Sequence, residues 1–174
     1  MLKNIFFAVL LCCFFGASVS AQNSGAYTLK LLQSTGADGV TFEDESIKIS
    51  FPLSTHLSFA LTNKTAAAIQ IDWKKASFTD VNGQPQKVVH NDIREVLKVD
   101  SQPVSEVQSG GSLGDTIVPV GFITQNDEGS WSLRKLFQGG IEAYAGKQFS
   151  LRLPIKVNGQ EKEYLFAFTV ETAK

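Results

Sequence analysis

Apolar and polar residues alternate most regularly between positions 57 and 73. Large side chains occupy every second position of the runs 57–62 and 68–73, with the polar turn Asn63-Lys64-Thr65 between them. A period of two buries one face of a strand, so the pattern predicts two consecutive strands. Either the strands pair directly, with Leu61 opposite Ile69, or the chain crosses here between two sheets. Both arrangements direct the same six side chains into one core: Leu57, Phe59, Leu61, Ile69, Ile71 and Trp73.

Shorter alternating runs predict further strands along the chain. Asn82-Gly83 is a strong hairpin signal, because both residues tolerate positive φ. Pro52 and Pro119 remove backbone donors and indicate strand ends or sheet edges. Residues 91–116 carry little pattern and predict a long connection with one short element near 96–99. The remaining strands expected are 27–31, 40–43, 47–53, one that begins at Phe78, 88–90 and 117–123.

Residues 130–138 fit two structures. Leu133, Leu136 and Phe137 have helical spacing, and Gly139-Gly140 would cap a helix that ends there. Trp131 and Leu133 also alternate as in a strand. We predict one short helix.

The chain ends in two long alternating runs on either side of Asn158-Gly159. A two-residue loop fixes the register of a hairpin, so Phe149 should face Phe168. Pro154 falls where its missing N–H would point away from the partner strand. We therefore expect the strand before the turn to be a sheet edge near Pro154, and the strand after the turn to lie inside the sheet.

Seven or more short strands, frequent turns and no long helical pattern predict an all-β protein. We expect an immunoglobulin-like two-sheet sandwich with at most one or two short helices, and a barrel is the alternative. Trp73 lies where such sandwiches often carry a core tryptophan. The length fits a single domain over residues 27–174, after a flexible lead-in at 22–26.

Residues 1–21 have the pattern of a secretory signal peptide. Lys3 precedes a short apolar run, and the small residues Val19-Ser20-Ala21 end at an expected cleavage site. The apolar run is shorter than the roughly 20 residues that a membrane span needs. A lipoprotein would carry a small residue before its lipidated cysteine, whereas Leu11 precedes Cys12. An outer-membrane lipoprotein is therefore the less favoured alternative.

Cleavage after Ala21 would leave a chain without cysteine, because Cys12 and Cys13 both lie in the leader. It would also remove Lys3 and no acid, which takes the formal charge from −1 to −2. That balance offers no basic excess for nucleic acid or for a membrane surface. We expect a periplasmic or extracellular protein with no transmembrane span after cleavage.

Few residues suggest catalysis. Gly110 to Gly114 match G-x-S-x-G around Ser112. A nucleophile elbow needs a buried strand before the motif and a helix after it. Here polar residues precede the motif and a strand-like run follows, so we interpret it as a glycine loop.

The two histidines, His56 and His90, would need acidic partners to bind a metal. Asp72, Asp80 and Asp92 are the candidates, but no H-x-H spacing accompanies them. We expect surface histidines at strand ends. The sequence therefore predicts no catalytic, cofactor-binding or metal-binding residue.

Two further motifs resemble functional sites. Asn63-Lys64-Thr65 is a glycosylation sequon, which a plain turn also explains. Asp80-Val81-Asn82-Gly83 begins like a calcium loop. Its glycine comes two places early and no glutamate closes the loop, so we interpret it as a hairpin turn.

One resemblance covers residues 47–170 in outline. A strand ends in Thr62-Asn63, the next ends in Asp72-Trp73, a strand with Phe78 turns at Asn82-Gly83, and a return strand ends in His90. This succession resembles uncharacterised bacterial cell-envelope proteins. The resemblance implies a small sandwich in the envelope, without an established reaction or ligand.

Together these observations predict a non-catalytic exported envelope protein with a binding or structural role. A protein partner would use an open sheet edge, near Pro154 or Pro119, or an exposed apolar patch. A carbohydrate or small-ligand module is the alternative, and it would expose Trp131 or Tyr144 as a stacking platform. A small hydrolase is the third, and it would bring His90 or His56 to a carboxylate.

Overall fold

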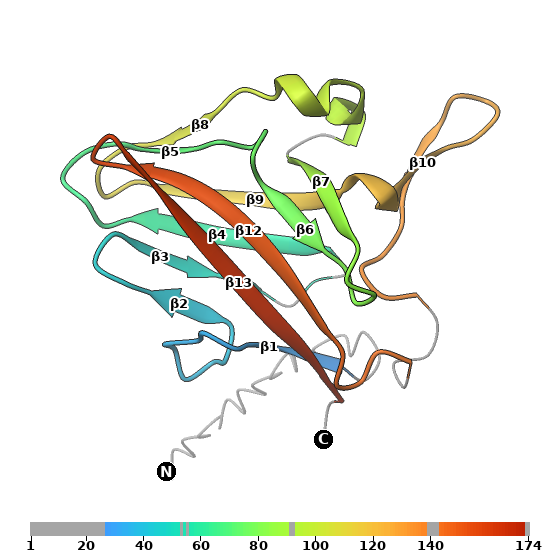
Figure 1. Cartoon of the computed structure of the whole chain (residues 1–174), viewed down its shortest axis with the longest axis horizontal. Helices are drawn as coiled ribbons and strands as arrows, with labels where there is room; N and C mark the ends of the chain where they lie inside the picture. Colours follow the sequence, from blue (N-terminus) through green and yellow to red (C-terminus); the bar gives the residue numbers. More distant parts are fainter. Residues whose placement is uncertain (1–26, 53, 55, 91–92, 139–142, 173–174) are drawn as a thin grey trace, which may run out of the picture.

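The computed structural model describes residues 27–52, 54, 56–90, 93–138 and 143–172 (Figure 1). The expected leader at 1–21 and lead-in at 22–26 lie outside the described residues. Within them the chain is built from β-strands and two short 3-10 helices, η1 (Ile93–Ser101) and η2 (Val120–Phe122). The all-β class is confirmed.

Eleven strands form one nearly closed antiparallel sheet. A separate hairpin pairs β10 (Ile123–Gln125) with β11 (Trp131–Leu133). In the large sheet, β5 (Ile69–Ile71) adds to β12 and to β8 (Ser105–Val107). The main order is β1 (Tyr27–Leu31), β13 (Gln160–Thr172), β12 (Gln148–Val157), β6 (Ser77–Thr79), β7 (Pro85–His90), β9 (Ser112–Pro119), β4 (Leu57–Asn63), β3 (Ile47–Ser50) and β2 (Thr41–Glu43).

The sheet folds over on itself, so that its two halves enclose the core. Figure 1 shows the long β12 and β13 crossing in front of β4 and β9. The hairpin from β6 to β7 joins the two halves, because β6 pairs with β12 and β7 pairs with β9. Connection through one hairpin makes this a continuous sheet, and the immunoglobulin-like topology stays a prediction.

The two runs that alternate most regularly do not pair with each other. β4 lies between β3 and β9, and Phe59 faces Asp115. β5 lies in the other half of the sheet, against β12 and β8. Direct pairing of Leu61 with Ile69 is therefore wrong, and the crossing between halves is correct. All six predicted core side chains are at most 2% exposed.

The C-terminal hairpin has the predicted register, with Phe149 opposite Phe168. Its turn places Asn158 at φ 49° and Gly159 at φ 82°, the left-handed conformation that a two-residue hairpin loop requires. β13 lies inside the sheet only over its C-terminal part, where it pairs with β1 from Leu31 opposite Phe168 to Tyr27 opposite Thr172.

Pro154 is not at a sheet edge. β6 covers β12 at Leu151 and β5 covers it at Ile155. Between these two pairs β12 advances four residues and the partner chain advances seven, from Ile71 to Phe78. The three extra residues form a bulge opposite Pro154, whose carbonyl accepts a hydrogen bond from the Asp72 N–H at 3.2 Å. Pro154 therefore lacks its N–H at the point where the neighbouring chain bulges, and β12 remains an interior strand.

Three further predictions need correction. Pro119 is not at an edge, because it ends an interior strand and pairs with Val88. The predicted helix at 130–138 is wrong, since Trp131 to Leu133 form β11. The connection at 91–116 contains more structure than one short element: η1, β8 and the start of β9.

Side chains close the seam between β2, the last strand of one half, and the N-terminal part of β13, which β1 does not cover. Asp44, in the turn after β2, accepts hydrogen bonds from Lys162 Nζ at 2.7 Å and from the Tyr164 hydroxyl at 3.1 Å. The Phe42 ring packs edge-on against Tyr164 and Phe166. These contacts join the two halves where no strand ladder does among the described residues.

Candidate functional site

His90 lies in a compact polar and aromatic cluster at the end of β7. Its Nδ1 is 2.9 Å from Asp115 Oδ2, and the two side chains are 13% and 11% exposed. The imidazole stacks on the Trp73 ring with centroids 4.2 Å apart and planes at 17°. Trp73 Nε1 donates to Ser105 Oγ at 2.8 Å. The prediction of a surface histidine at a strand end is therefore wrong for His90, which contacts Asp115 and Trp73.

The contacts around His90 are those of a packed interior. The buried Gln102 accepts a hydrogen bond from the His90 backbone N–H and donates to the carbonyls of Val88 and Val99. These bonds join the 3-10 helix η1 to β7. A histidine and a carboxylate at this distance can act as a general base when a substrate reaches the free nitrogen. Here one ring face is covered by Trp73, which favours a structural role for the pair.

Ser112 does not occupy a nucleophile elbow. It begins β9, pairs with Thr62 of β4, and its hydroxyl lies 2.9 Å from the Thr62 hydroxyl. The G-x-S-x-G match is a glycine turn followed by a strand. The turn bonds to β4 through Asn63, whose N–H donates to Gly111 O and whose carbonyl accepts from the Gly110 N–H.

The candidate metal ligands are dispersed. Asp72 lies in the bulge and pairs with Lys75 at 3.7 Å. Asp80 caps the β6–β7 turn by accepting from the backbone N–H groups of Asn82 and Gln84. Asp92 lies outside the described residues. Among the residues that the structure describes, no three His, Cys, Asp or Glu side chains gather as metal ligands do.

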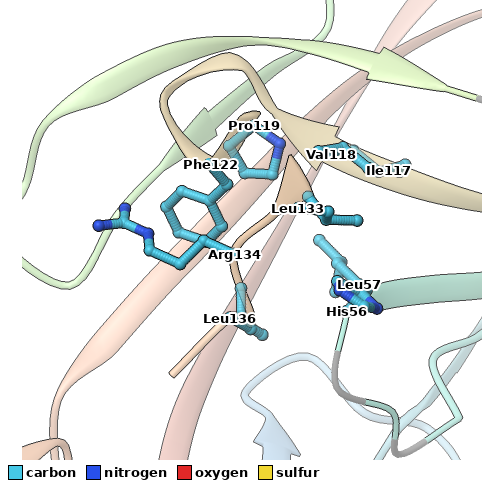
Figure 2. Close-up of a pocket in the computed structure, with 9 residues that line it drawn as sticks. All are labelled: His56, Leu57, Ile117, Val118, Pro119, Phe122, Leu133, Arg134 and Leu136. Atoms are coloured by element: carbon cyan, nitrogen blue, oxygen red, sulfur yellow. The ribbon is translucent and has the colours of Figure 1, made fainter. Parts of the chain in front are cut away.

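His56 lines a small apolar cavity at one end of the sheet (Figure 2). The cavity of about 10 Å³ has room for one water molecule. Arg134 borders it with its guanidinium over the Phe122 ring, 4.4 Å from the centroid. Burial, with a smaller contribution from nearby Lys135, lowers the pKa of His56 below 6.5. The other side chains lining the cavity are Leu57, Ile117, Val118, Pro119, Leu133 and Leu136.

The two aromatic residues proposed as a carbohydrate platform are both half-buried. The Tyr144 ring packs on Phe137, and its hydroxyl donates to the Gln138 carbonyl at 2.9 Å. Lys147 Nζ lies over the same ring, 5.8 Å from its centroid. Trp131 belongs to the separate β10–β11 hairpin. The two rings therefore have different surroundings and do not share a strand.

The sequon asparagine is structural. Asn63 is fully buried, and its Nδ2 donates to the carbonyls of Ala67, Val107 and Gln108. Its Oδ1 accepts from the Thr65 N–H. Asn63 thus connects the end of β4 to the approach to β5 and to the end of β8. A side chain enclosed in this way is not accessible to a glycosylating enzyme.

One backbone edge among the described residues is the N-terminal half of β13. β1 ends opposite Phe168, and one further bond joins the Leu32 N–H to the Ala167 carbonyl. The Gln33 side chain then accepts from the Ala167 N–H at 3.0 Å. Successive strand residues point their N–H and C=O to opposite sides, so Leu165, Glu163 and Glu161 point the same way as Ala167. No described strand pairs with them on that side.

This edge carries an apolar residue among charges. Leu165 is 57% exposed on the outer face. Next to it a shallow hollow of about 260 Å³ crosses β13, β12 and β6, with Ala167, Ser150 and Thr79 in its lining. Glu163 pairs with Arg152 at 2.8 Å and Glu161 pairs with Lys75 at 2.5 Å. An extended backbone is the ligand that such an edge binds.

Comparison with known proteins found no match: no family model, no curated protein and no solved structure resembles this chain significantly. Among the described residues, no helix has the length and apolar character of a membrane span.

The sequence missed two features of these sites. No local signal in the sequence marks Asp115 as the partner of His90, because it lies 25 residues away in the glycine-rich connection. The free edge at Glu161 to Leu165 is the second, because the sequence predicts that this strand lies inside the sheet. Its sequence carries one usable signal, since Leu165 is a large apolar residue on the polar face of an alternating strand.

Proposed function

We propose that this protein is a non-catalytic, exported module of the bacterial cell envelope that acts by binding another protein. One observation carries the proposal: the sheet has a free backbone edge at Glu161 to Leu165, with Leu165 exposed beside it. The buried Gln102 and Asn63 and the half-buried His90 make bonds that hold elements of the fold together. The proposed binding surface therefore lies on the outside of the sheet. The signal-peptide pattern of residues 1–21 supports export, and an immunoglobulin-like arrangement is part of the same proposal.

Photo-crosslinking in intact cells tests this function. A photoreactive residue is placed singly at Leu165, at Leu97 and at Thr124, three exposed positions on different elements. We expect a discrete adduct with one envelope protein from at least one position. The mature chain should be recovered in the exported fraction and should begin at Gln22. A cytoplasmic protein, or the absence of a discrete adduct from every position, would overturn the proposal.

The contact between His90 and Asp115 favours a second candidate, a small hydrolase. A hydrolase would turn over activated esters or amides. The variant His90→Asn would then lose this turnover and still fold. We expect no turnover that depends on His90, because Trp73 covers one ring face and Gln102 fixes the strand end. Turnover lost in His90→Asn and retained in Ser112→Ala would support the hydrolase instead.

A further inference from the structure

We infer that a hollow beside the β6–β7 turn binds the carboxylate or phosphate group of a small ligand. The hollow has a volume of about 110 Å³ and lies between this turn and the segment that follows β11. A cavity of about 10–15 Å³ already holds one water molecule, so this hollow has room for such a group. No residue of β13 lines it, and the inference goes beyond the proposed protein-binding function.

Three cations surround the hollow. Arg134 and Lys135 belong to its lining, and Lys147 Nζ lies over the ring of Tyr144, which is a third lining residue. No carboxylate in the described part of the chain lies within ion-pair distance of these three cations. Their positive charge is therefore available to an anion from solution.

Arg134 is already positioned for an oxyanion. Its backbone N–H donates to the Phe122 carbonyl at 2.8 Å, and its guanidinium stacks on the Phe122 ring, 4.4 Å from the centroid. Stacking covers a face of the guanidinium and leaves the in-plane N–H groups able to donate. Figure 2 shows the guanidinium pointing away from His56. Because the side chain is held in place, less entropy is lost on binding, and its fork matches two oxygens of one carboxylate or phosphate group.

Neutral donors complete the site. The side-chain amides of Asn82 and Gln138 line the hollow, and neither amide makes a hydrogen bond to another described residue. Each amide nitrogen offers two N–H donors. The Tyr144 hydroxyl donates to the Gln138 carbonyl at 2.9 Å and so fixes the backbone on this side of the hollow. An oxyanion in the hollow would therefore meet neutral donors as well as cations.

Asp80 is the carboxylate of the lining. Its oxygens accept hydrogen bonds from the backbone N–H groups of Asn82 and Gln84 and from the Gln86 side chain. Two cations line the hollow with this one carboxylate, and Lys147 adds a third positive charge beside them. The balance is positive, which attracts an anion. The Asp80 charge repels a ligand that carries several negative groups, so a single oxyanion group fits best.

Three variants separate this site from general surface charge. Arg134→Gln removes the guanidinium, and Lys135→Gln removes the second cation while the stacking on Phe122 remains. Arg152→Gln is the matched control, because Arg152 is an exposed arginine on β12 that does not line the hollow. Thermal melting checks that each variant folds. Lys135→Gln carries the test if Arg134→Gln does not fold.

Binding is measured by NMR titration of the isotope-labelled protein with sodium phosphate and, separately, with sodium acetate. Sodium chloride keeps the ionic strength constant. We expect saturable shifts of the side-chain amide signals of Asn82 and Gln138. Arg134→Gln and Lys135→Gln should each weaken binding about tenfold, as the loss of a charge-assisted hydrogen bond predicts. Arg152→Gln should weaken it by less than about twofold.

The two anions distinguish the sources of the oxyanion. Tighter binding of phosphate supports the site and assigns it to a phosphate-bearing ligand, and tighter binding of acetate supports it and assigns it to a carboxylate-bearing ligand. The absence of a saturable shift with either anion would overturn the inference. Undiminished binding by both Arg134→Gln and Lys135→Gln, or an equal loss in Arg152→Gln, would also overturn it.

Discussion

Asn63 shows how one buried side chain can determine a local fold. Its amide nitrogen donates to carbonyls of two segments, at Ala67 and at Val107-Gln108, and its side-chain carbonyl accepts from the Thr65 N–H in the turn that follows. Buried polar groups that lose their partner carry the full cost of desolvation. The residue that the sequence marks as a modification site is therefore an interior connection.

Replacing Asn63 with alanine should destabilise the protein by about 2–4 kcal/mol, because it leaves buried carbonyls without a donor. Urea unfolding of the purified domain measures the loss. Thr62→Ala is the neighbouring control, since the Thr62 hydroxyl bonds to Ser112 on the exposed face, and it should cost less than about 1 kcal/mol. Equal losses in the two variants would contradict the role given to Asn63.

His56 should make stability depend on pH. Burial in the apolar cavity lowers its pKa in the folded protein below the ordinary 6.5, so the unfolded chain takes up a proton first. The free energy of unfolding is then highest above pH 6.5 and falls as the pH drops through the folded pKa. Urea unfolding at pH 7.5 and pH 5.0 measures this loss.

His56→Leu removes the titrating group and keeps the cavity filled. We expect the stability difference between pH 7.5 and pH 5.0 to shrink in this variant. A difference as large as in the unsubstituted protein would assign the pH dependence to other groups.

At the scale of elements, the tight turn of the β12–β13 hairpin sets its register. Gly159 adopts φ 82°, where a side chain is strained although the surrounding space is open. Gly159→Ala should cost about 1 kcal/mol or more. Asn158→Gly is the matched control and should be nearly neutral, because glycine tolerates the same positive φ. Thermal melting of both variants measures the effect, and a neutral Gly159→Ala would show that the turn does not constrain the hairpin.

Sequence patterns predict a strand and its neighbour correctly where the two strands are adjacent in the chain and a short turn joins them. The register of the last hairpin followed from its two-residue loop. The alternation in β4 and β5 predicted which side chains are buried and could not identify the strands beside them. Phe59 faces Asp115, and the sequence contains no short-range signal for that distant pairing. The crossing of β4 and β5 remained one of two alternatives for the same reason.

The incorrect predictions have related causes. Leu133, Leu136 and Phe137 have helical spacing, yet Leu133 belongs to β11 and Leu133 and Leu136 line the cavity at the end of the sheet. The apolar residues of this segment are spaced as in a helix because they contact the end of the sheet, although the segment begins as a strand. Pro154 indicated a missing ladder bond correctly, but a bulge in the neighbouring chain accommodates it and no edge results. The free edge was missed because its location depends on where β1 ends.

At the scale of the whole molecule, Asp44 links the two halves of the sheet across the seam. Burial alone would raise the pKa of Asp44, but hydrogen bonds from Lys162 and from the N–H groups of Ile47 and Ser46 outweigh it and lower the pKa below 3.8. The stabilisation is therefore present above pH 3.8 and is lost as the pH falls through the folded pKa.

Asp44→Asn should lower the free energy of unfolding at pH 7 by about 1–3 kcal/mol, because it removes the charge that Lys162 contacts. Denaturant unfolding at pH 7 and pH 3 measures both the loss and a weaker acid dependence. Glu45→Gln, at the exposed neighbouring position, is the control and should change stability by less than about 0.5 kcal/mol. Identical behaviour of the two variants would exclude Asp44 as the connection.

The pairing of Tyr27 with Thr172 determines how the molecule would bear mechanical load. Tension between these two paired residues acts across β1 and β13, so the rungs of the ladder would open one at a time, as in a zipper. A partner held at Glu161 to Leu165 would instead pull along β13, against a load applied at Tyr27. Hydrogen bonds perpendicular to the strands are then sheared together. The same five-residue ladder would yield at low force in the first direction and resist in the second.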